Sequence, residues 1–222
     1  VPQPVDEVAE TAGQREQVFL VTKVLPSNAS RKGVARACEA SLRRLKTDNV
    51  DLYLLHWSGS YPLEETVRGF EDLVAAGKIR SWGVSNLDLA EMKQLVALPG
   101  GSACAANQLL YNLSRRGIEL DLLPWCQERR IPVMAYSPVE QGRILGHKAL
   151  KQVAQRLGAT PAQVALAWTL RQEGVVSIPK AATVAHVREN RKALELELDA
   201  EALQALDAAF PPPAKARPLE ML

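Results

Sequence analysis

The chain has 222 residues, of which 47% are hydrophobic and 23% are charged. These values are typical of a globular protein and exclude a disordered or collagen-like chain. The 27 lysine and arginine residues nearly balance the 25 aspartate and glutamate residues, so the formal net charge is +2. This balance gives no electrostatic reason to expect a nucleic acid or an anionic membrane surface as a partner.

Apolar, β-branched runs alternate along the chain with amphipathic stretches of helical period. The predicted strands are 18–22, 50–55, 79–84, 104–109, 132–136 and 175–178. The predicted helices are 32–45, 63–76, 87–98, 119–128, 148–157, 162–173, 183–194 and 200–210. Pro124 lies inside the fourth helix and predicts that it is short or kinked. Thr160 and Pro161 are a cap and a first helical residue for the sixth.

Strands that alternate with helices predict a parallel sheet covered by helices, either an open doubly wound sheet or a closed (β/α)8 barrel. No GxGxxG motif follows any predicted strand, which removes the best sign of a Rossmann domain. A complete barrel has eight strands and about 250 residues. We therefore expect residues 1–222 to form a single α/β domain, a (β/α)8 TIM barrel truncated at its N-terminus. Six of its eight strand–helix units would be present, and the first two absent.

Polar or aromatic residues stand at or near the end of each predicted strand. They are Lys23, His56, Trp57, Ser85, Asn86, Gln108, Tyr136, Ser137, Pro179 and Lys180. Taken alone, Lys23 has two equally weighted interpretations: a partly buried lysine that has a lowered pKa or lowers the pKa of a neighbouring acid, or a lysine whose stem packs and whose head reaches water. His56 taken alone is more readily interpreted as a core residue. Taken together, they converge on one mouth of a barrel, where the active site of this fold lies.

The residue types at this mouth suit a nucleotide cofactor. Ser85, Asn86 and Gln108 can hydrogen-bond a carboxamide, and Tyr136 offers a flat face on which an aromatic ring can stack. Lys180 and His186 flank the start of a late helix, whose N-terminal amides favour a phosphate. The three histidines and three cysteines form no cluster with metal-ligand spacing, so we expect no metal.

Six segments resemble the aldo-keto reductases, in the right order and spacing: FLVTK, DLYLLHW, GKIRSWGVSN, ANQLLYN, MAYSPVEQG and SIPKAATVAHVREN. The resemblance covers residues 14–209 and is nearest to bacterial members that reduce small aldehydes. It implies NADPH-dependent reduction of aldehydes and ketones to alcohols by a monomer without metal. The three widely spaced cysteines, none of them in a CxxC pair, favour reduced thiols and therefore a cytoplasmic protein. Short segments after His56 and at the C-terminus favour small aldehydes, dicarbonyls or sugars as substrates.

The resemblance also implies residue roles. Lys23 and His56 match two members of the catalytic tetrad, in which the lysine lowers the pKa of a proton-donating tyrosine and the histidine orients the carbonyl. Trp57 would line the substrate site. The cofactor residues implied are Ser85, Asn86 and Gln108 for the carboxamide, Tyr136 for ring stacking, Ser137, Val139 and Gln141 for the pyrophosphate, Lys180 for the 2′-phosphate, and Thr183, His186, Glu189 and Asn190 for the adenosine.

The sequence also departs from the family pattern. His186 stands where many members have an arginine, which weakens the expected preference for NADPH. Ala181 stands where many have a serine. The tetrad's aspartate and tyrosine would precede residue 14, where Asp6 is present but is not assigned that role and no tyrosine occurs. We therefore expect the chain to be part of a longer protein.

Two alternative functions stay open at this point. The absent tyrosine is compatible with a degenerate or regulatory barrel that binds NADPH without catalysis. Lys23, at a strand end, is compatible with a lyase that forms a Schiff base. The residues that match the cofactor contacts favour the reductase.

Overall fold

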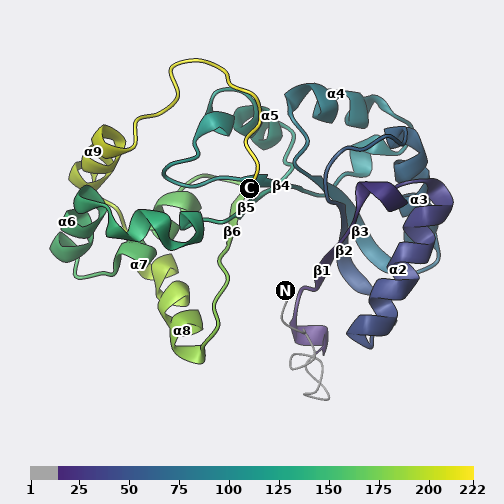
Figure 1. Ribbon diagram of the computed structural model, residues 1–222, viewed down its shortest axis with the longest axis horizontal. Coiled ribbons are helices and arrows are strands. Elements are labelled where there is room, and N and C mark those ends of the chain that lie inside the picture. The colour runs from purple at the N-terminus through teal and green to yellow at the C-terminus, as the bar shows by residue number, and fades with distance from the viewer. Residues whose placement is uncertain (1–14) are drawn as a thin grey trace. The chain divides into compact units, whose positions relative to one another are not determined.

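The computed structural model describes residues 15–222. The chain divides into two compact units, one ending at Ala106 and the other covering residues 107–222 (Figure 1). All six predicted strands occur within the described residues. The strand pairs within each unit are parallel, which confirms the predicted α/β class. No helix of residues 15–222 is long and apolar enough to cross a membrane.

The first unit is a parallel sheet with β2 between β1 and β3. Its elements are β1 (Val21–Val24), α2 (Arg31–Leu45), β2 (Val50–Leu55), α3 (Leu63–Ala75), β3 (Ile79–Ser85) and α4 (Leu89–Ala97). Short 3-10 helices lie at Arg15–Gln17, Pro26–Asn28 and Gly101–Ala103. Helices α2 and α3 pack side by side along the sheet (Figure 1).

The core of this unit is built on β2, whose six residues are all buried. The ring of Tyr53 meets Phe70 edge-on at 5.8 Å between centroids, and Phe70 stacks on Trp82 at 5.4 Å. The helices begin where the sequence supplies caps. The Ser30 hydroxyl accepts a hydrogen bond from the amide of Gly33 at the start of α2.

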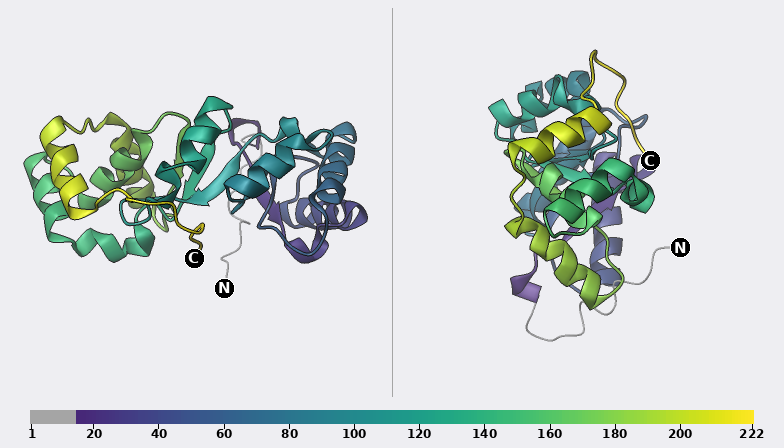
Figure 2. Two further views of the ribbon diagram at one scale, coloured as in Figure 1. Left: turned by 90° about the horizontal axis from the view of Figure 1, so that it is seen from above. Right: turned by 90° about the vertical axis from the view of Figure 1, so that its left-hand side faces the viewer.

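The second unit contains β4 (Asn107–Leu110), α5 (Leu122–Glu128), β5 (Val133–Tyr136), α6 (Lys148–Arg156), α7 (Pro161–Leu170), β6 (Val175–Ile178), α8 (Val184–Lys192) and α9 (Ala200–Ala209). Its 3-10 helices lie at Gly117–Glu119, Glu140–Gly146 and Ala193–Glu195. Strand β5 lies between β4 and β6. Helix α9 packs on α6 (Figure 2). Buried Trp168 has the guanidinium groups of Arg116 and Arg171 over its ring, at 5.0 and 3.9 Å from the centroid.

Two predicted strands need correction. The first runs over Val21–Val24 rather than 18–22, because Val18 and Phe19 are exposed and precede the sheet. The fourth is Asn107–Leu110 rather than 104–109. The helix that contains Pro124 is short, as predicted. It begins at Leu122, so the proline lies in the first turn, where an amide has no intrahelical partner.

Candidate active site

The first unit places Lys23, His56 and Ser85 on one face of its sheet. Lys23 is registered opposite Leu54, and Leu54 opposite Gly83. His56 follows Leu54 by two residues, and Ser85 follows Gly83 by two. Because side chains alternate between the faces of a sheet, the three polar side chains share a face. Parallel pairing thus places three of the five candidates that the sequence predicted in this unit on one face of the sheet.

Two of the candidates predicted at strand ends lie inside strands instead. Lys23 is the third of four residues of β1, and Gln108 is the second residue of β4. His56 lies just beyond β2, but its amide still donates to the carbonyl oxygen of Val24 at 3.0 Å. The backbone of β2 therefore keeps its extended pairing as far as the histidine.

A glycine in the middle of β3 makes this arrangement possible. A Cβ atom at Gly83 would lie 2.5 Å from the carbonyl oxygen of Ala106 and 2.9 Å from Cδ2 of Leu54. Real Cβ atoms do not approach backbone oxygens so closely, so the position requires glycine. The sequence analysis did not single this residue out, because the contact is visible only in the folded sheet.

The pKa values of the two basic groups, Lys23 and His56, are both lowered. Burial lowers the pKa of Lys23 from its ordinary value. Burial also lowers the pKa of His56, and the nearby charge of Lys23 lowers it further. At neutral pH the imidazole is therefore held uncharged, with one nitrogen that donates and one that accepts a hydrogen bond.

Asn86 joins the ends of β2 and β3. Its side-chain amide donates to the carbonyl oxygen of His56 at 3.1 Å and to the Ser85 hydroxyl at 3.2 Å. Its backbone is left-handed, with φ of 56°, a conformation that asparagine tolerates better than most residues. Trp57 stands beside His56, with the ring centroids 4.5 Å apart, and is exposed.

In the second unit, Gln108 and Tyr136 share a face of the sheet. Leu110 is registered opposite Tyr136, and Gln108 precedes Leu110 by two residues. Gln108 is buried, whereas Tyr136 is only partly buried. Burial raises the pKa of Tyr136, although a hydrogen bond from the backbone amide of Leu222 opposes the shift.

The segment after β5 is bent by three non-glycine residues in the left-handed region. Ser137, Glu140 and Gln141 have φ of 49°, 50° and 56°. Such a backbone persists only where its surroundings hold it. The buried carboxylate of Glu140 provides this support: it accepts hydrogen bonds from Asn112 at 2.9 Å and from Arg115 at 3.1 Å.

Two further contacts complete the cluster around Glu140. Arg143 also donates to this carboxylate, at 3.0 Å, and the Asn112 amide donates to the carbonyl oxygen of Ser137 at 2.9 Å. Arg115 in addition pairs with Glu220 at 2.7 Å. The sequence analysis missed Glu140, since nothing in the local sequence shows that a carboxylate will be buried among partners from distant segments.

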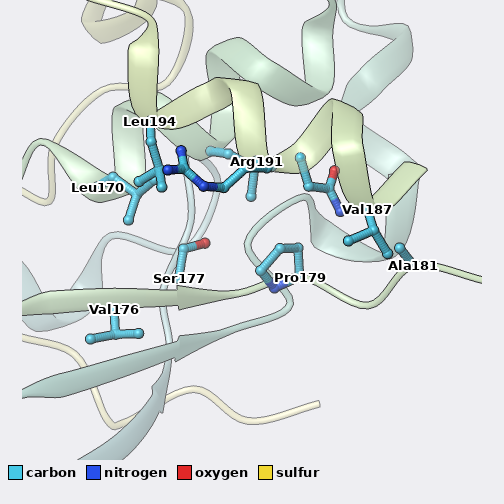
Figure 3. A pocket seen from close by; sticks show the side chains of 10 residues that line it. Leu170, Val176, Ser177, Pro179, Ala181, Val187, Arg191 and Leu194 are labelled. Atoms are coloured by element: carbon cyan, nitrogen blue, oxygen red, sulfur yellow. The ribbon is translucent and has the colours of Figure 1, made fainter. Parts of the chain in front are cut away.

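The remaining candidates lie around α8. Thr183 caps the helix, and its hydroxyl accepts a hydrogen bond from the amide of His186 at 3.2 Å. Lys180 and His186 are exposed, whereas Glu189 and Asn190 are partly buried. A groove of about 530 Å³ separates α8 from β6 and α7 (Figure 3). Pro179, Ala181 and Val187 line its end nearest the start of α8.

The predicted site residues thus divide between the two units. Lys23, His56, Trp57, Ser85 and Asn86 belong to the first. Gln108, Tyr136, Ser137, Val139, Gln141, Lys180, Thr183, His186, Glu189 and Asn190 belong to the second. Asp6 lies outside the described residues. Within residues 15–222, no group of three histidine, cysteine, aspartate or glutamate side chains could hold a metal ion.

The chain is similar to known proteins of one family. The Aldo/keto reductase family model matches residues 5–210. Methylglyoxal reductase YeaE of Escherichia coli is 55% identical over 215 residues, which cover 95% of this chain and 76% of the relative. Glyoxal reductase of Bacillus subtilis is 34% identical to this chain, and the aligned residues cover 90% of this chain and 71% of the glyoxal reductase. An aldo-keto reductase from Klebsiella pneumoniae, solved in complex with NADPH, has a TM-score of 0.93 and 50% identity, with 95% of this chain and 76% of that chain covered.

The chain therefore belongs to the aldo/keto reductase family and is an oxidoreductase of that class. Its fold is that of the family's (β/α)8 barrel, and residues 15–222 form six of the strand–helix repeats of that barrel.

Proposed function

We propose that this protein uses NADPH to reduce small aldehydes and α-dicarbonyls, with methylglyoxal as the representative substrate. The observation that carries the proposal is the placement of Lys23, His56 and Ser85 on one sheet face. It is supported by the 55% identity to a methylglyoxal reductase. The exposed Trp57 beside His56 would line a site open to a small substrate.

The residues fit a nicotinamide cofactor. Gln108 and the partly buried ring of Tyr136 share a face, as a carboxamide contact and a stacking surface require. Ser85 and Asn86 would add to the carboxamide contacts, and the segment with Ser137, Val139 and Gln141 would hold the pyrophosphate. At the capped start of α8, Lys180 would pair with the 2′-phosphate, with Thr183, His186, Glu189 and Asn190 around the adenosine. When bound, the cofactor supplies the hydride.

Lys23 and His56 supply the protein's part of the chemistry. The uncharged imidazole of His56 can donate a hydrogen bond to a carbonyl oxygen and so orient it. The ammonium of Lys23 lowers the pKa of an acid placed beside it. None of the chain's own tyrosines is assigned the part of proton donor. Tyr53 packs in the core against Phe70.

Tyr111 is likewise buried and donates its hydroxyl proton to Glu119 at 2.7 Å. Tyr61 is exposed after the second strand. We assign Tyr136 to cofactor stacking.

We also propose that both units belong to one barrel domain, because a single family model spans the boundary between them.

The test is consumption of NADPH by the protein as its gene encodes it, with methylglyoxal, glyoxal and a bulky aromatic aldehyde as substrates. We expect turnover with the two small dicarbonyls and a lower kcat/KM with the bulky aldehyde. His56→Ala should lower kcat about 10²- to 10³-fold, the usual range for loss of a hydrogen-bond donor to the reacting oxygen. Absence of NADPH consumption with every carbonyl compound would contradict the proposal.

A further inference from the structure

Helix α8 has few apolar contacts to hold it in place. No residue of Val184–Lys192 is buried, and Val184 and Val187 are 68% and 56% exposed. The groove lies along one side of the helix (Figure 3). In Figure 1 the C-terminal end of the helix lies near α7. Polar contacts near its C-terminal half join the helix to α7.

Those contacts come from the N-terminal end of α7, where Thr160 is the N-cap residue. The Thr160 hydroxyl donates a hydrogen bond to Oε1 of Glu189 at 2.7 Å. The side-chain amide of Gln163 donates to the backbone carbonyl oxygen of Glu189 at 3.2 Å. One residue pair on α7 thus holds both the carboxylate and the backbone of a single residue on α8.

The same two residues form the capping box of α7. The Thr160 hydroxyl accepts from the Gln163 amide at 3.2 Å, and the Gln163 side chain accepts from the Thr160 amide at 3.0 Å. A hydroxyl has one proton to donate and two lone pairs. Thr160 therefore uses a lone pair for the cap and its only proton for Glu189, so the two contacts can be separated by substitution.

We propose that Thr160 is a positioning residue for the adenosine end of the cofactor, and that it acts by fixing the carboxylate of Glu189. This inference rests on the proposed function, in which Glu189 contacts the adenosine. With one carboxylate oxygen held by Thr160, the second is presented in a fixed direction to a donor such as the adenine amino group. A prepositioned side chain loses less rotational freedom when the ligand binds, which corresponds to roughly 3- to 10-fold in affinity.

Three substitutions separate the tether from the cap. Thr160→Asp keeps an oxygen that caps α7, but at neutral pH it has no proton to donate. Thr160→Val loses both contacts without introducing charge. Thr160→Ser keeps both. A loss of affinity shared by the aspartate and valine variants, and absent from the serine variant, isolates the donated hydrogen bond from the cap and from charge.

The readout compares ligands that carry different parts of the cofactor. 2′,5′-ADP carries the adenosine end, and reduced nicotinamide mononucleotide carries only the nicotinamide end. In T160D and T160V we expect about 3- to 10-fold weaker binding of 2′,5′-ADP and NADPH, with unchanged binding of the mononucleotide. T160S should bind all three ligands as the wild type does. Thermal unfolding followed by circular dichroism confirms that each variant is folded.

Each other outcome counts against a specific claim. If the wild type binds NADPH and both variants bind 2′,5′-ADP equally well, the tether has no positioning role. The same conclusion follows if the variants lose affinity for all ligands alike, or if T160S behaves as T160V does. If the wild type binds neither NADPH nor 2′,5′-ADP, the proposed function fails and this inference fails with it.

Discussion

Lys23 and His56 lie on the same face of the β1–β2 pair, since Lys23 is registered opposite Leu54 and His56 follows Leu54 by two residues. The pairing places a cationic group near an imidazole that is partly buried. Burial and the lysine charge then act in the same direction, and both favour the neutral form of His56. The chemistry proposed for this site therefore follows from strand register and burial.

Removal of the Lys23 charge should raise the pKa of His56. In Lys23→Met the burial that lowers this pKa persists, but the electrostatic contribution of the lysine is lost. NMR titration of the His56 ring protons measures the change. Lys93→Met, which removes an exposed lysine on α4 of the same unit, is the matched control and should leave the titration unchanged. An unchanged pKa in Lys23→Met would show that the two groups are not coupled.

The lowered pKa of His56 also predicts how stability depends on pH. The unfolded chain binds a proton at this residue near the ordinary value of 6.5, whereas the folded chain binds it only at lower pH. Stability should therefore fall as the pH drops below about 6.5. Urea unfolding of the wild type and of His56→Asn, from about pH 7 to pH 5, isolates this contribution. Parallel pH profiles for the two proteins would argue against a shifted histidine.

Glu140 should stabilise the segment after β5 chiefly through charged hydrogen bonds. Burial alone would raise its pKa, but hydrogen bonds from Asn112, Arg115 and Arg143 outweigh burial and lower it. Glu140→Ala should cost about 1.5–3 kcal/mol of unfolding free energy for each charge-assisted bond that is not replaced by water. Glu140→Gln keeps the shape of the side chain and should therefore cost less unfolding free energy than Glu140→Ala.

The free energy of unfolding at acid pH tests the same carboxylate. Because its folded pKa is lowered, its contribution is present above the ordinary value of 4.5 and is lost as pH falls through the folded value. Urea unfolding at a series of acid pH values should give a shallower slope for Glu140→Gln than for the wild type. Identical slopes would mean that the carboxylate titrates as it does in the unfolded chain.

Gly83 should tolerate no side chain. In Gly83→Ala the new Cβ atom meets the carbonyl oxygen of Ala106 at 2.5 Å, so β3 or residue 106 must move. We expect a loss of about 1–3 kcal/mol, typical of overpacking. Gly146→Ala is the control, because its Cβ atom would meet nothing within 4 Å, and it should stay within about 0.5 kcal/mol of the wild type. Equal unfolding midpoints for the two variants would refute the steric argument.

Periodicity and caps predicted most of the fold, because these signals are local. Thr160 with Pro161 gave the start of α7, and the six apolar strands were placed within a few residues. The first strand was shifted because Val18 and Phe19 have strand-like residue types but lie outside the sheet. Burial against the rest of the protein decides such ends, and the local pattern does not show it.

The candidate site was predicted less completely than the fold. Strand ends and family motifs indicated Lys23, His56 and Tyr136. The contacts around the candidate site residues were not predictable from the sequence. Glu140 pairs with Arg115, 25 residues away, and Glu189 pairs with Thr160, 29 residues away. Contacts at such separations depend on the packing of whole helices and strands, which a single sequence does not reveal.

The most direct test of the account is a calorimetric titration of the protein with NADPH and with NADH. The cofactor contacts that we propose predict saturable NADPH binding, and the proposed pairing of Lys180 with the 2′-phosphate predicts about tenfold weaker binding of NADH. In Lys180→Met the preference for NADPH over NADH should be lost. Failure of the wild type to bind NADPH at all would contradict the assignment of these residues to a cofactor site.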